Sequence, residues 1–298
     1  MSLVDVSRLD LEQITLPARN VEAYLVAFLR HRPLPANLKQ AVEYGLLGGG
    51  KLVRPILTIR CCEAVGGKPE QALAAAAAIE MVHAFSLVHD DLPAMDDDDL
   101  RRGRPTLHKH AGEAMAVLAG DAMLALAFEL IATRMKSADT ALEVIRELSI
   151  GTNDMIVGQV QDTLPGEDTD MDPIDRLEQI HKNKTGALLR AACRMGGICG
   201  GAAAAQLADL TRYALAVGLM FQAVDDLLDV TSTADEVGKK TQKDAEQGKL
   251  TYPAVLGIEG TREQIERLHA QALDALEGFD KKADPLRELC DFLAVRQK

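Results

Sequence analysis

Three long stretches of the chain are apolar on most of their faces, and they give the first indication of the fold. They span residues 70–91, 113–135 and 207–230 and are rich in Ala and Leu, which favour helices. A helix that is apolar on most faces belongs inside a bundle rather than on its surface. The pattern therefore predicts a buried central layer of helices.

Strand signals are scarce in the rest of the chain. No stretch clearly alternates apolar and polar positions with β-branched and aromatic residues, and Trp is absent. The Gly-rich stretch 195–206 has apolar flanks, which favours a tight turn between two helices. Four segments mark loops, at 31–35, 65–69, 164–175 and 232–249. None of them has the length or simple composition of an interdomain linker, so we expect an all-α fold with residues 1–298 in a single domain.

The overall charge narrows the range of partners. The 298 residues carry a formal net charge of −12, which argues against nucleic acids and anionic lipid surfaces as ligands. The longest uncharged apolar runs, such as 195–208, are short for a membrane span, and the first residues lack the apolar core of a signal peptide. The five cysteines have no metal-binding or redox spacing. We expect a cytoplasmic protein with reduced thiols and no stable membrane association.

Two aspartates lie on an apolar helix where charge is costly. Asp225 and Asp229 are four residues apart, so they share one face of the stretch 207–230. Carboxylates on such a face repel each other and lose solvation, and they therefore need a partner. The partner is either an Arg or Lys on a neighbouring helix or a divalent cation.

A second acidic patch follows the first apolar stretch. Asp90 and Asp91 end the predicted helix, and the next acid is Asp96. A spacing of six does not keep two side chains on one face of a regular helix, and Pro93 interrupts it. We expect a local bulge over residues 92–95 to return Asp96 to the side of Asp90.

Mg²⁺ is the cation that suits both patches. It is commonly held by one or two carboxylates together with waters and substrate phosphates. Neither patch has the alternating acids, central Gly and terminal Glu of an EF-hand. The sequence "GLLGGGKL" (45–52) fits part of a P-loop pattern, but Leu52 replaces the required Ser or Thr and no strand precedes it. We therefore expect two Mg²⁺ sites that face a shared phosphate ligand.

Basic residues lie close to the acids and near predicted helix ends. Arg101, Arg102 and Arg104 follow the first patch directly, and Arg is suited to bidentate phosphate contacts. The further basic residues at such positions are Lys51, Arg54, Lys184, Lys239, Lys240 and Lys249. One of these alone is typical of a solvated surface charge. Together with the two acidic patches they favour a diphosphate ligand.

The motifs resemble those of the trans-isoprenyl diphosphate synthases. "DDLPAMDDDDLRRGRP" and "FQAVDDLLD" are similar to the two aspartate-rich motifs of that family, and "GGGKLVRP", "KTGAL" and "GKKTQKDAEQGKLTYP" to its remaining blocks. The resemblance covers residues 44–253 with five motifs in order. It implies an all-helical fold around a deep apolar cavity, a homodimer, and a reaction that joins an allylic diphosphate to isopentenyl diphosphate.

The resemblance also implies roles for individual residues. Three Mg²⁺ ions per site would be held by Asp90, Asp96 and Asp225, with Asp91 and Asp229 as ligands or supporting groups. The allylic diphosphate would be bound by Arg101, Lys184, Thr185, Gln222, Lys239 and Lys249. The isopentenyl diphosphate would be bound by Lys51, Arg54, His83 and Arg102. The residues expected to act in catalysis are Asp90, Asp96, Arg101, Lys184 and Asp225, and the basic tail with Arg296 and Lys298 would fold over the site.

Product length is expected to depend on Phe85 and Ser86. Phe85 precedes Asp90 by five residues, which places it more than one helical turn below the metal site. An aromatic residue here, and four residues between Asp91 and Asp96, resemble bacterial farnesyl diphosphate synthases. The expected product is farnesyl diphosphate, made from dimethylallyl and geranyl diphosphates. Geranyl or geranylgeranyl diphosphate is the alternative, because a Phe on an apolar helix is also typical of a core.

Three other functions fit the sequence less well. A terpene cyclase needs a single diphosphate site, and the second aspartate-rich motif and the block with Lys51 and Arg54 argue against it. A non-catalytic synthase subunit is expected to have lost one acidic patch, whereas both are intact. A helical metal-buffering protein leaves the basic residues unexplained.

Overall fold

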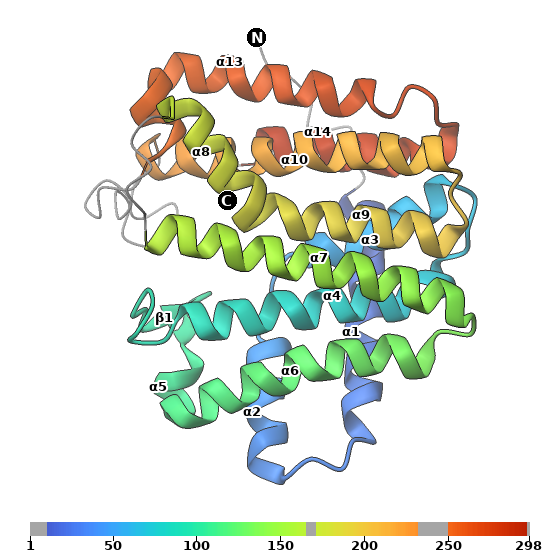
Figure 1. Ribbon diagram of the computed structural model, residues 1–298, viewed down its shortest axis with the longest axis vertical. Coiled ribbons are helices and arrows are strands. Elements are labelled where there is room, and N and C mark those ends of the chain that lie inside the picture. The colour runs from blue at the N-terminus through green and yellow to red at the C-terminus, as the bar shows by residue number, and fades with distance from the viewer. Residues whose placement is uncertain (1–10, 165–170, 232–249, 297–298) are drawn as a thin grey trace.

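The computed structural model describes residues 11–164, 171–231 and 250–296 as a stack of helices (Figure 1). The longer helices are α1 (Leu11–Arg30), α2 (Ala36–Leu46), α3 (Val53–Ala64), α4 (Pro69–Asp90), α6 (Glu113–Arg134), α7 (Ala138–Thr163), α9 (Ala187–Gly200), α10 (Ala204–Thr231), α13 (Tyr252–Asp274) and α14 (Asp284–Val295). Shorter elements are α5 (Leu107–Ala111), α8 (Pro173–His181), a π-helical turn (Lys182–Gly186) and a 3₁₀ turn (Lys281–Ala283). The all-α expectation is confirmed.

Helix α4 has the buried position that its composition predicts. Every residue from Ala74 to Val82 is buried, and α4 packs against α3, α6 and α9. The small Ala side chains of this helix let its neighbours approach closely on several sides. The three apolar stretches of the sequence correspond to α4, α6 and α10, and all three contribute to one continuous core.

Two of these helices are long and apolar enough to meet the criteria for a membrane span. By length and composition, α4 and α6 could each cross a membrane, whereas we expected apolar runs too short for a span. In α4, 72% of the apolar window is buried inside the bundle, as in the core helix of a globular protein. The corresponding value for α6 is 44%, so α6 keeps an apolar surface.

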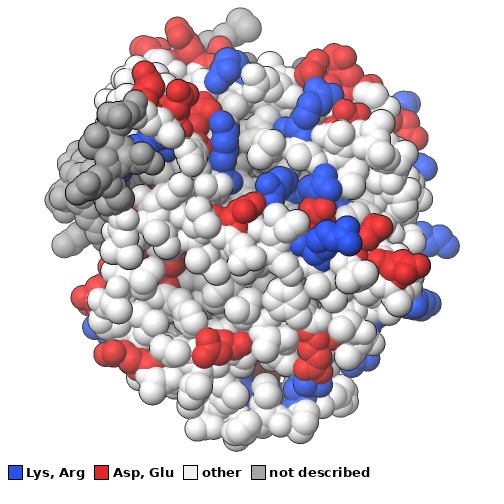
Figure 2. Space-filling model, in the orientation of Figure 1, with Lys and Arg blue, Asp and Glu red and all other residues white. Residues whose placement is uncertain are grey.

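That surface continues from α6 onto α7. The apolar face consists of Val117 and Leu118 of α6 and Ile150, Val157 and Val160 of α7, and each of these side chains is between 40% and 55% exposed. The three α7 residues recur at intervals of seven and three, which places them on one side of the helix. Figure 2 shows that charged residues are sparse over the part of the surface that α6 and α7 occupy.

A short hairpin is the exception to the all-helical architecture in the described part of the chain. Strand β1 (Leu100–Arg101) pairs antiparallel with β2 (Arg104–Pro105), with Arg101 opposite Arg104. The two residues between them, Arg102 and Gly103, have φ angles of 53° and 73°. Positive φ at both central positions defines the tight hairpin turn that suits twisted strands. The hairpin gives the consecutive residues Arg101 and Arg102 different neighbours, Asp91 for the first and Gly50 for the second.

The fold brings several helix ends together at one side of the bundle. The C-terminal ends of α4, α7 and α10 lie at the left of Figure 1, which is also the side of the hairpin. The π-helical turn packs against α7, α8, α9 and α10. The two acidic patches, which are more than 120 residues apart in sequence, therefore end on the same side of the core.

Candidate active site

The chain after α4 folds back on itself and closes the first acidic patch. The backbone N–H of Asp96 donates to the carbonyl of Asp90 at 2.8 Å, and the N–H of Met95 donates to the carbonyl of Leu92 at 2.8 Å. Asp97 then adopts a left-handed conformation with φ of 49°. The expected bulge is confirmed, and it brings Asp96 beside Asp90 in spite of the spacing of six.

Asp90 lies in an environment that disfavours its charge. Burial raises its pKa to about 6; the nearby Lys184 opposes this shift, and the carboxylate of Asp96 adds to it. Two neighbouring carboxylates that lose solvation need a cation to remain ionised together. Lys184 supplies one positive charge from the π-helical turn, and the carboxylate oxygens suit a hard divalent cation.

Asp91 has the supporting position, which was one of the two roles that the resemblance implied for it. It is 2% exposed, accepts a hydrogen bond from Arg101 Nε at 2.7 Å, and forms an ion pair with Arg101 Nη2 at 2.6 Å. Arg101 also approaches Asp98 at 3.8 Å. The Asp91 carboxylate is thus engaged in fixing the hairpin, whereas Asp90 and Asp96 remain half-buried beside each other. Asp91 supports the site through Arg101 rather than as a free metal ligand.

The second acidic patch divides in the same way. Asp225 accepts a hydrogen bond from Arg296 Nη2 at 2.7 Å. The adjacent Asp226 is 6% exposed and accepts from the backbone N–H of Tyr252 at 2.9 Å, so it anchors the start of α13. Asp229 is half-buried one turn beyond Asp225, on the same side of α10. Of the two partners that the sequence left open for this face, the structure shows the Arg, and a divalent cation stays a prediction.

The π-helical turn carries two of the residues that we expected at the allylic diphosphate. Lys184 Nζ lies 2.6 Å from Asp162 of α7, and Thr185 Oγ1 donates to Gln222 of α10 at 2.8 Å. Gly158 of α7 is required beside this turn, because a Cβ there would overlap the backbone nitrogen of Lys184. π-Helical turns are frequent at functional sites. The turn therefore joins α7 and α10 across the site.

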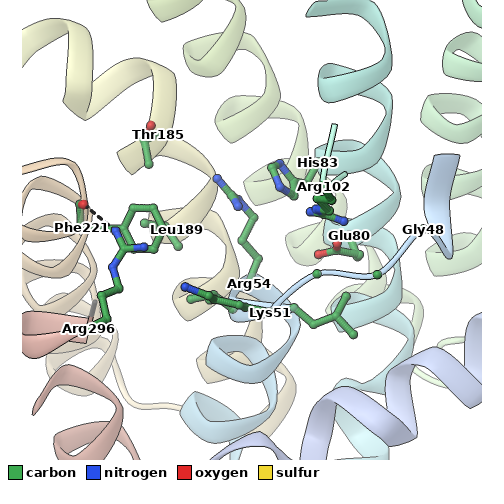
Figure 3. Close-up of a pocket in the computed structure, with 14 residues that line it drawn as sticks. Gly48, Lys51, Arg54, Glu80, His83, Arg102, Thr185, Leu189, Phe221 and Arg296 are labelled. Carbon is green, nitrogen blue, oxygen red and sulfur yellow. Dashed lines mark hydrogen bonds between the residues drawn. The ribbon is translucent and has the colours of Figure 1, made fainter. Parts of the chain in front are cut away.

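Figure 3 shows a cavity of about 590 Å³, and one of its lining residues, Arg296, pairs with Asp225 of the second acidic patch. Its wall includes all four residues that the resemblance assigned to isopentenyl diphosphate, namely Lys51, Arg54, His83 and Arg102. The guanidinium group of Arg102 passes directly over Gly50, where any Cβ would collide with it. The four residues come from the α2–α3 loop, α3, α4 and the hairpin turn, and the fold collects them around one space.

His83 is a neutral member of this wall. Burial and then the positive charges of Arg54, Arg102 and Arg101 hold its pKa well below the usual value. An uncharged imidazole offers one N–H donor to an anion and no full charge. The cationic attraction in the cavity therefore comes from Lys51, Arg54, Arg102 and the C-terminal Arg296, whose side chain also reaches the wall.

A second cavity, of about 460 Å³, opens beside the first acidic patch. Phe85 and Ser86 of α4 line it, together with apolar residues of α7 such as Met155, Ile156 and Val160. Phe85 is 7% exposed and packs edge-on against the His89 ring. This cavity shares Arg54, His83 and Thr185 with the first one, so a cationic space and a largely apolar space meet at one place.

The carboxylates fit Mg²⁺ when a phosphate completes its coordination. Among the described residues no three His, Cys, Asp or Glu side chains form a ready-made metal cluster. The site instead offers pairs of carboxylates, Asp90 with Asp96 and Asp225 with Asp229. Mg²⁺ accepts such partial protein coordination and completes it with water and substrate phosphates.

Four residues of the site were not anticipated from the sequence. Asp162 pairs with Lys184, Glu80 and Phe221 line the cationic cavity, and Gln159 of α7 has a buried Nε2 without a hydrogen-bond partner in the apolar one. Asp162 and Gln159 lie in an ordinary amphipathic stretch that carries no charge cluster. The predictions for Lys239, Lys240, Lys249 and Lys298 fall outside the described residues.

Comparisons with known proteins agree with this geometry. The polyprenyl synthetase family matches residues 35–285. Geranylgeranyl pyrophosphate synthase 11 of Arabidopsis thaliana is 49% identical over 269 residues, 88% of this chain and 75% of the plant protein. The solved structure of a putative farnesyl-diphosphate synthase from Marinomonas is 38% identical, with a TM-score of 0.81 over 96% of this chain and 100% of that one.

A geranylgeranyl pyrophosphate synthetase from Pyrococcus horikoshii is also similar in structure, with 29% identity and a TM-score of 0.86 over 95% of this chain and 97% of that one. The fold and the paired acidic patches define a prenyltransferase that acts on isoprenyl diphosphates. The chain belongs to the polyprenyl synthetase family.

Proposed function

We propose that the protein elongates an allylic diphosphate with isopentenyl diphosphate in an active site formed by the two cavities. The observation that carries the proposal is their junction at Arg54, His83 and Thr185. The cationic cavity suits a small substrate that is mostly diphosphate. The apolar cavity suits a growing hydrocarbon whose diphosphate lies at the mouth, beside Asp90 and Lys184.

The chain's own residues contribute charge, alignment and exclusion of water. Lys184 and Arg101 stabilise the diphosphate that leaves the allylic carbon. Lys51, Arg54 and Arg102 hold isopentenyl diphosphate so that its double bond faces that carbon. The apolar wall with Phe85 and Met155 keeps water from the allylic cation. The departing diphosphate accepts the proton that is lost, because the low pKa of His83 makes it a weak base and Glu80 lies among cations.

Members of this family generally use Mg²⁺ for diphosphate binding. We assign its binding to Asp90, Asp96, Asp225 and Asp229, with three ions per site as the expected number. When bound, Mg²⁺ neutralises the diphosphate and makes it a better leaving group. Asp91 and Asp226 hold the surrounding backbone, through Arg101 and Tyr252 respectively.

We further propose geranylgeranyl diphosphate as the main product. Relatives with 45–49% identity are named geranylgeranyl pyrophosphate synthases, and they support the longer of the products considered from the sequence. For this reason we prefer geranylgeranyl diphosphate to farnesyl diphosphate, the product that we expected from the sequence. Exposed apolar residues of α7, such as Ile156 and Val160, leave one side of the apolar cavity without a bulky aromatic barrier.

Farnesyl diphosphate remains the second candidate because of Phe85. This ring lies in the wall of the apolar cavity, five residues before Asp90, where it shortens the space for a chain that grows along α4. The 38% identical structure from Marinomonas, described as a putative farnesyl-diphosphate synthase, supports the same alternative.

One incubation separates these products. Purified protein is given Mg²⁺, labelled isopentenyl diphosphate and either geranyl or farnesyl diphosphate, and the dephosphorylated products are chromatographed. Geranylgeraniol from both allylic substrates supports the proposal. Farnesol from geranyl diphosphate, with no elongation of farnesyl diphosphate, establishes the second candidate. Absence of any condensation by folded protein rejects the function.

We also propose that the protein is a homodimer that pairs through the apolar face of α6 and α7. Leu118, Val157 and Val160 are each about half exposed, and a surface of this kind marks an interface in a globular protein. Sedimentation is expected to give about twice the 32.1 kDa chain mass. Substitution of Leu118 and Val157 by Lys should yield a folded monomer, and an unchanged mass would exclude this face as the dimer interface.

We likewise propose that the protein is located in the cytoplasm.

A further inference from the structure

Glu80 is an acidic side chain in the wall of a cavity that we assign to an anion. It lies on α4, is 4% exposed, and shares the cationic cavity with Lys51, Arg54 and Arg102. A buried carboxylate beside a diphosphate weakens binding by repulsion unless it has a compensating task. The sequence analysis assigned it no role, because a single Glu in an Ala-rich helix carries no pattern.

The surroundings of Glu80 identify that task. Figure 3 shows its carboxylate beneath the guanidinium group of Arg102, with Arg54 on the adjacent side of the cavity. Arg54 comes from α3 and Arg102 from the hairpin turn, and the positive charge of Arg102 lowers the pKa of Arg54. Burial, and then the charge of Arg102, depress the pKa of Arg54 to about 10, whereas Glu80 acts in the opposite direction. Burial also lowers the pKa of Arg102, and the same carboxylate opposes that shift.

The positions of these two arginines depend on few other anchors. Arg54 Nε is buried without a hydrogen-bond partner. Arg102 stands on a backbone with φ of 53°, and its guanidinium group rests against Gly50. In the described part of the chain neither guanidinium group forms an ion pair within 4.0 Å, with Glu80 or with another carboxylate. Glu80 lines the same cavity as both, beneath Arg102, and its charge attracts both guanidinium groups across that cavity.

We propose that Glu80 is a positioning residue for isopentenyl diphosphate, which keeps Arg54 and Arg102 together and directed into the cavity. The diphosphate then meets a preformed pair of guanidinium groups, and the cost of ordering two long side chains is met before it binds. The inference rests on the proposed function, since it concerns the substrate of that same site.

The proposal and simple charge repulsion predict opposite changes in the KM for isopentenyl diphosphate when Glu80 loses its charge. Glu80→Gln keeps the shape of the side chain and removes one negative charge. If Glu80 only repelled the substrate, the variant would bind isopentenyl diphosphate more tightly. If Glu80 organises the arginines, the KM for isopentenyl diphosphate rises by about tenfold, because the two guanidinium groups lose the opposite charge that orients them. The KM for the allylic diphosphate stays unchanged.

The experiment measures both KM values and the thermal unfolding of the wild type and Glu80→Gln. Glu63→Gln is the matched control, because it removes the carboxylate partner of the buried Arg60 at 2.8 Å, on α3 but outside both cavities. A selective rise in the KM for isopentenyl diphosphate supports the proposal. An unchanged or lower KM overturns it, as does an equal rise for both substrates. A wild type without condensation activity rejects the proposed function instead.

A double-substitution cycle tests the connection through Arg102. In an Arg102→Ala background, Glu80→Gln is expected to change the KM for isopentenyl diphosphate by less than half its effect in the wild type. Full additivity overturns the proposal. If Glu80→Gln does not fold, Glu80→Asp takes its place: a selective rise in the same KM supports the positioning role, and no rise contradicts it.

Discussion

The N–H of Asp96 lies 2.8 Å from the carbonyl oxygen of Asp90, and this hydrogen bond determines the shape of the first acidic patch. It closes a turn that regular helix geometry does not allow, because the two residues are six apart. The turn places two carboxylates together at the mouth of the apolar cavity. Of the neighbouring carboxylates, Asp91 is buried and binds Arg101, whereas Asp97 is exposed to solvent.

Asp90→Asn is expected to lower the turnover number by at least about 100-fold, because Asp90 is assigned to hold Mg²⁺ against the leaving diphosphate. The measurement is steady-state condensation at saturating Mg²⁺. Asp97→Asn is the matched control, since it changes an exposed carboxylate of the same turn and Asn tolerates the φ of 49°. Comparable losses in both variants would show that the turn is merely sensitive to substitution.

Phe85→Ala is expected to lengthen the product by at least one five-carbon unit relative to the wild type, because the ring occupies part of the apolar cavity. Chromatography of the dephosphorylated products reads the change. Phe279→Ala removes another buried ring, 9% exposed and outside both cavities, and controls for loss of packing. An identical product distribution in Phe85→Ala and the wild type would exclude Phe85 as the limit on chain length.

Arg296→Gln is expected to raise the KM for isopentenyl diphosphate by about tenfold, because the cationic cavity loses a charge that is 4% exposed and lies 3.8 Å over the Phe221 ring. Initial rates at varied isopentenyl diphosphate give the value. Arg262→Gln removes an exposed Arg, 56% accessible, from a surface pair with Glu259. It should leave the KM as in the wild type. Equal KM values for Arg296→Gln and the wild type would remove the C-terminal arginine from the site.

Gly158→Ala is expected to destabilise the protein by about 1–3 kcal/mol and to reduce turnover, because a Cβ would overlap the backbone of Lys184 in the π-helical turn. Chemical unfolding and rate measurements test the two effects. Gly278→Ala adds the same methyl group where nothing lies within 4 Å and should be nearly neutral. A fully stable and active Gly158→Ala variant would show that the turn adapts easily.

The candidate site was partly accessible from the sequence because some of its signals are local. Asp225 and Asp229 share a face by spacing alone, and the cluster around Asp90 is visible as composition. Lys51, Arg54, His83 and Arg102 were assigned together through the resemblance, and the fold collects them around one cavity. Glu80 and Asp162 were missed because each is a single acid whose partners lie on other helices.

The sequence by itself determined the helical core, the acidic patches and the family, since periodicity and composition act over a few turns of one chain segment. Only the tertiary structure decided the partner of each charge. Asp91 forms an ion pair with Arg101, Asp225 with Arg296, and Lys184 with Asp162. These pairs could not be read from the sequence, because contacts between side chains depend on how distant helices pack. The tight hairpin turn that separates Arg101 from Arg102 likewise sets adjacent residues to different tasks.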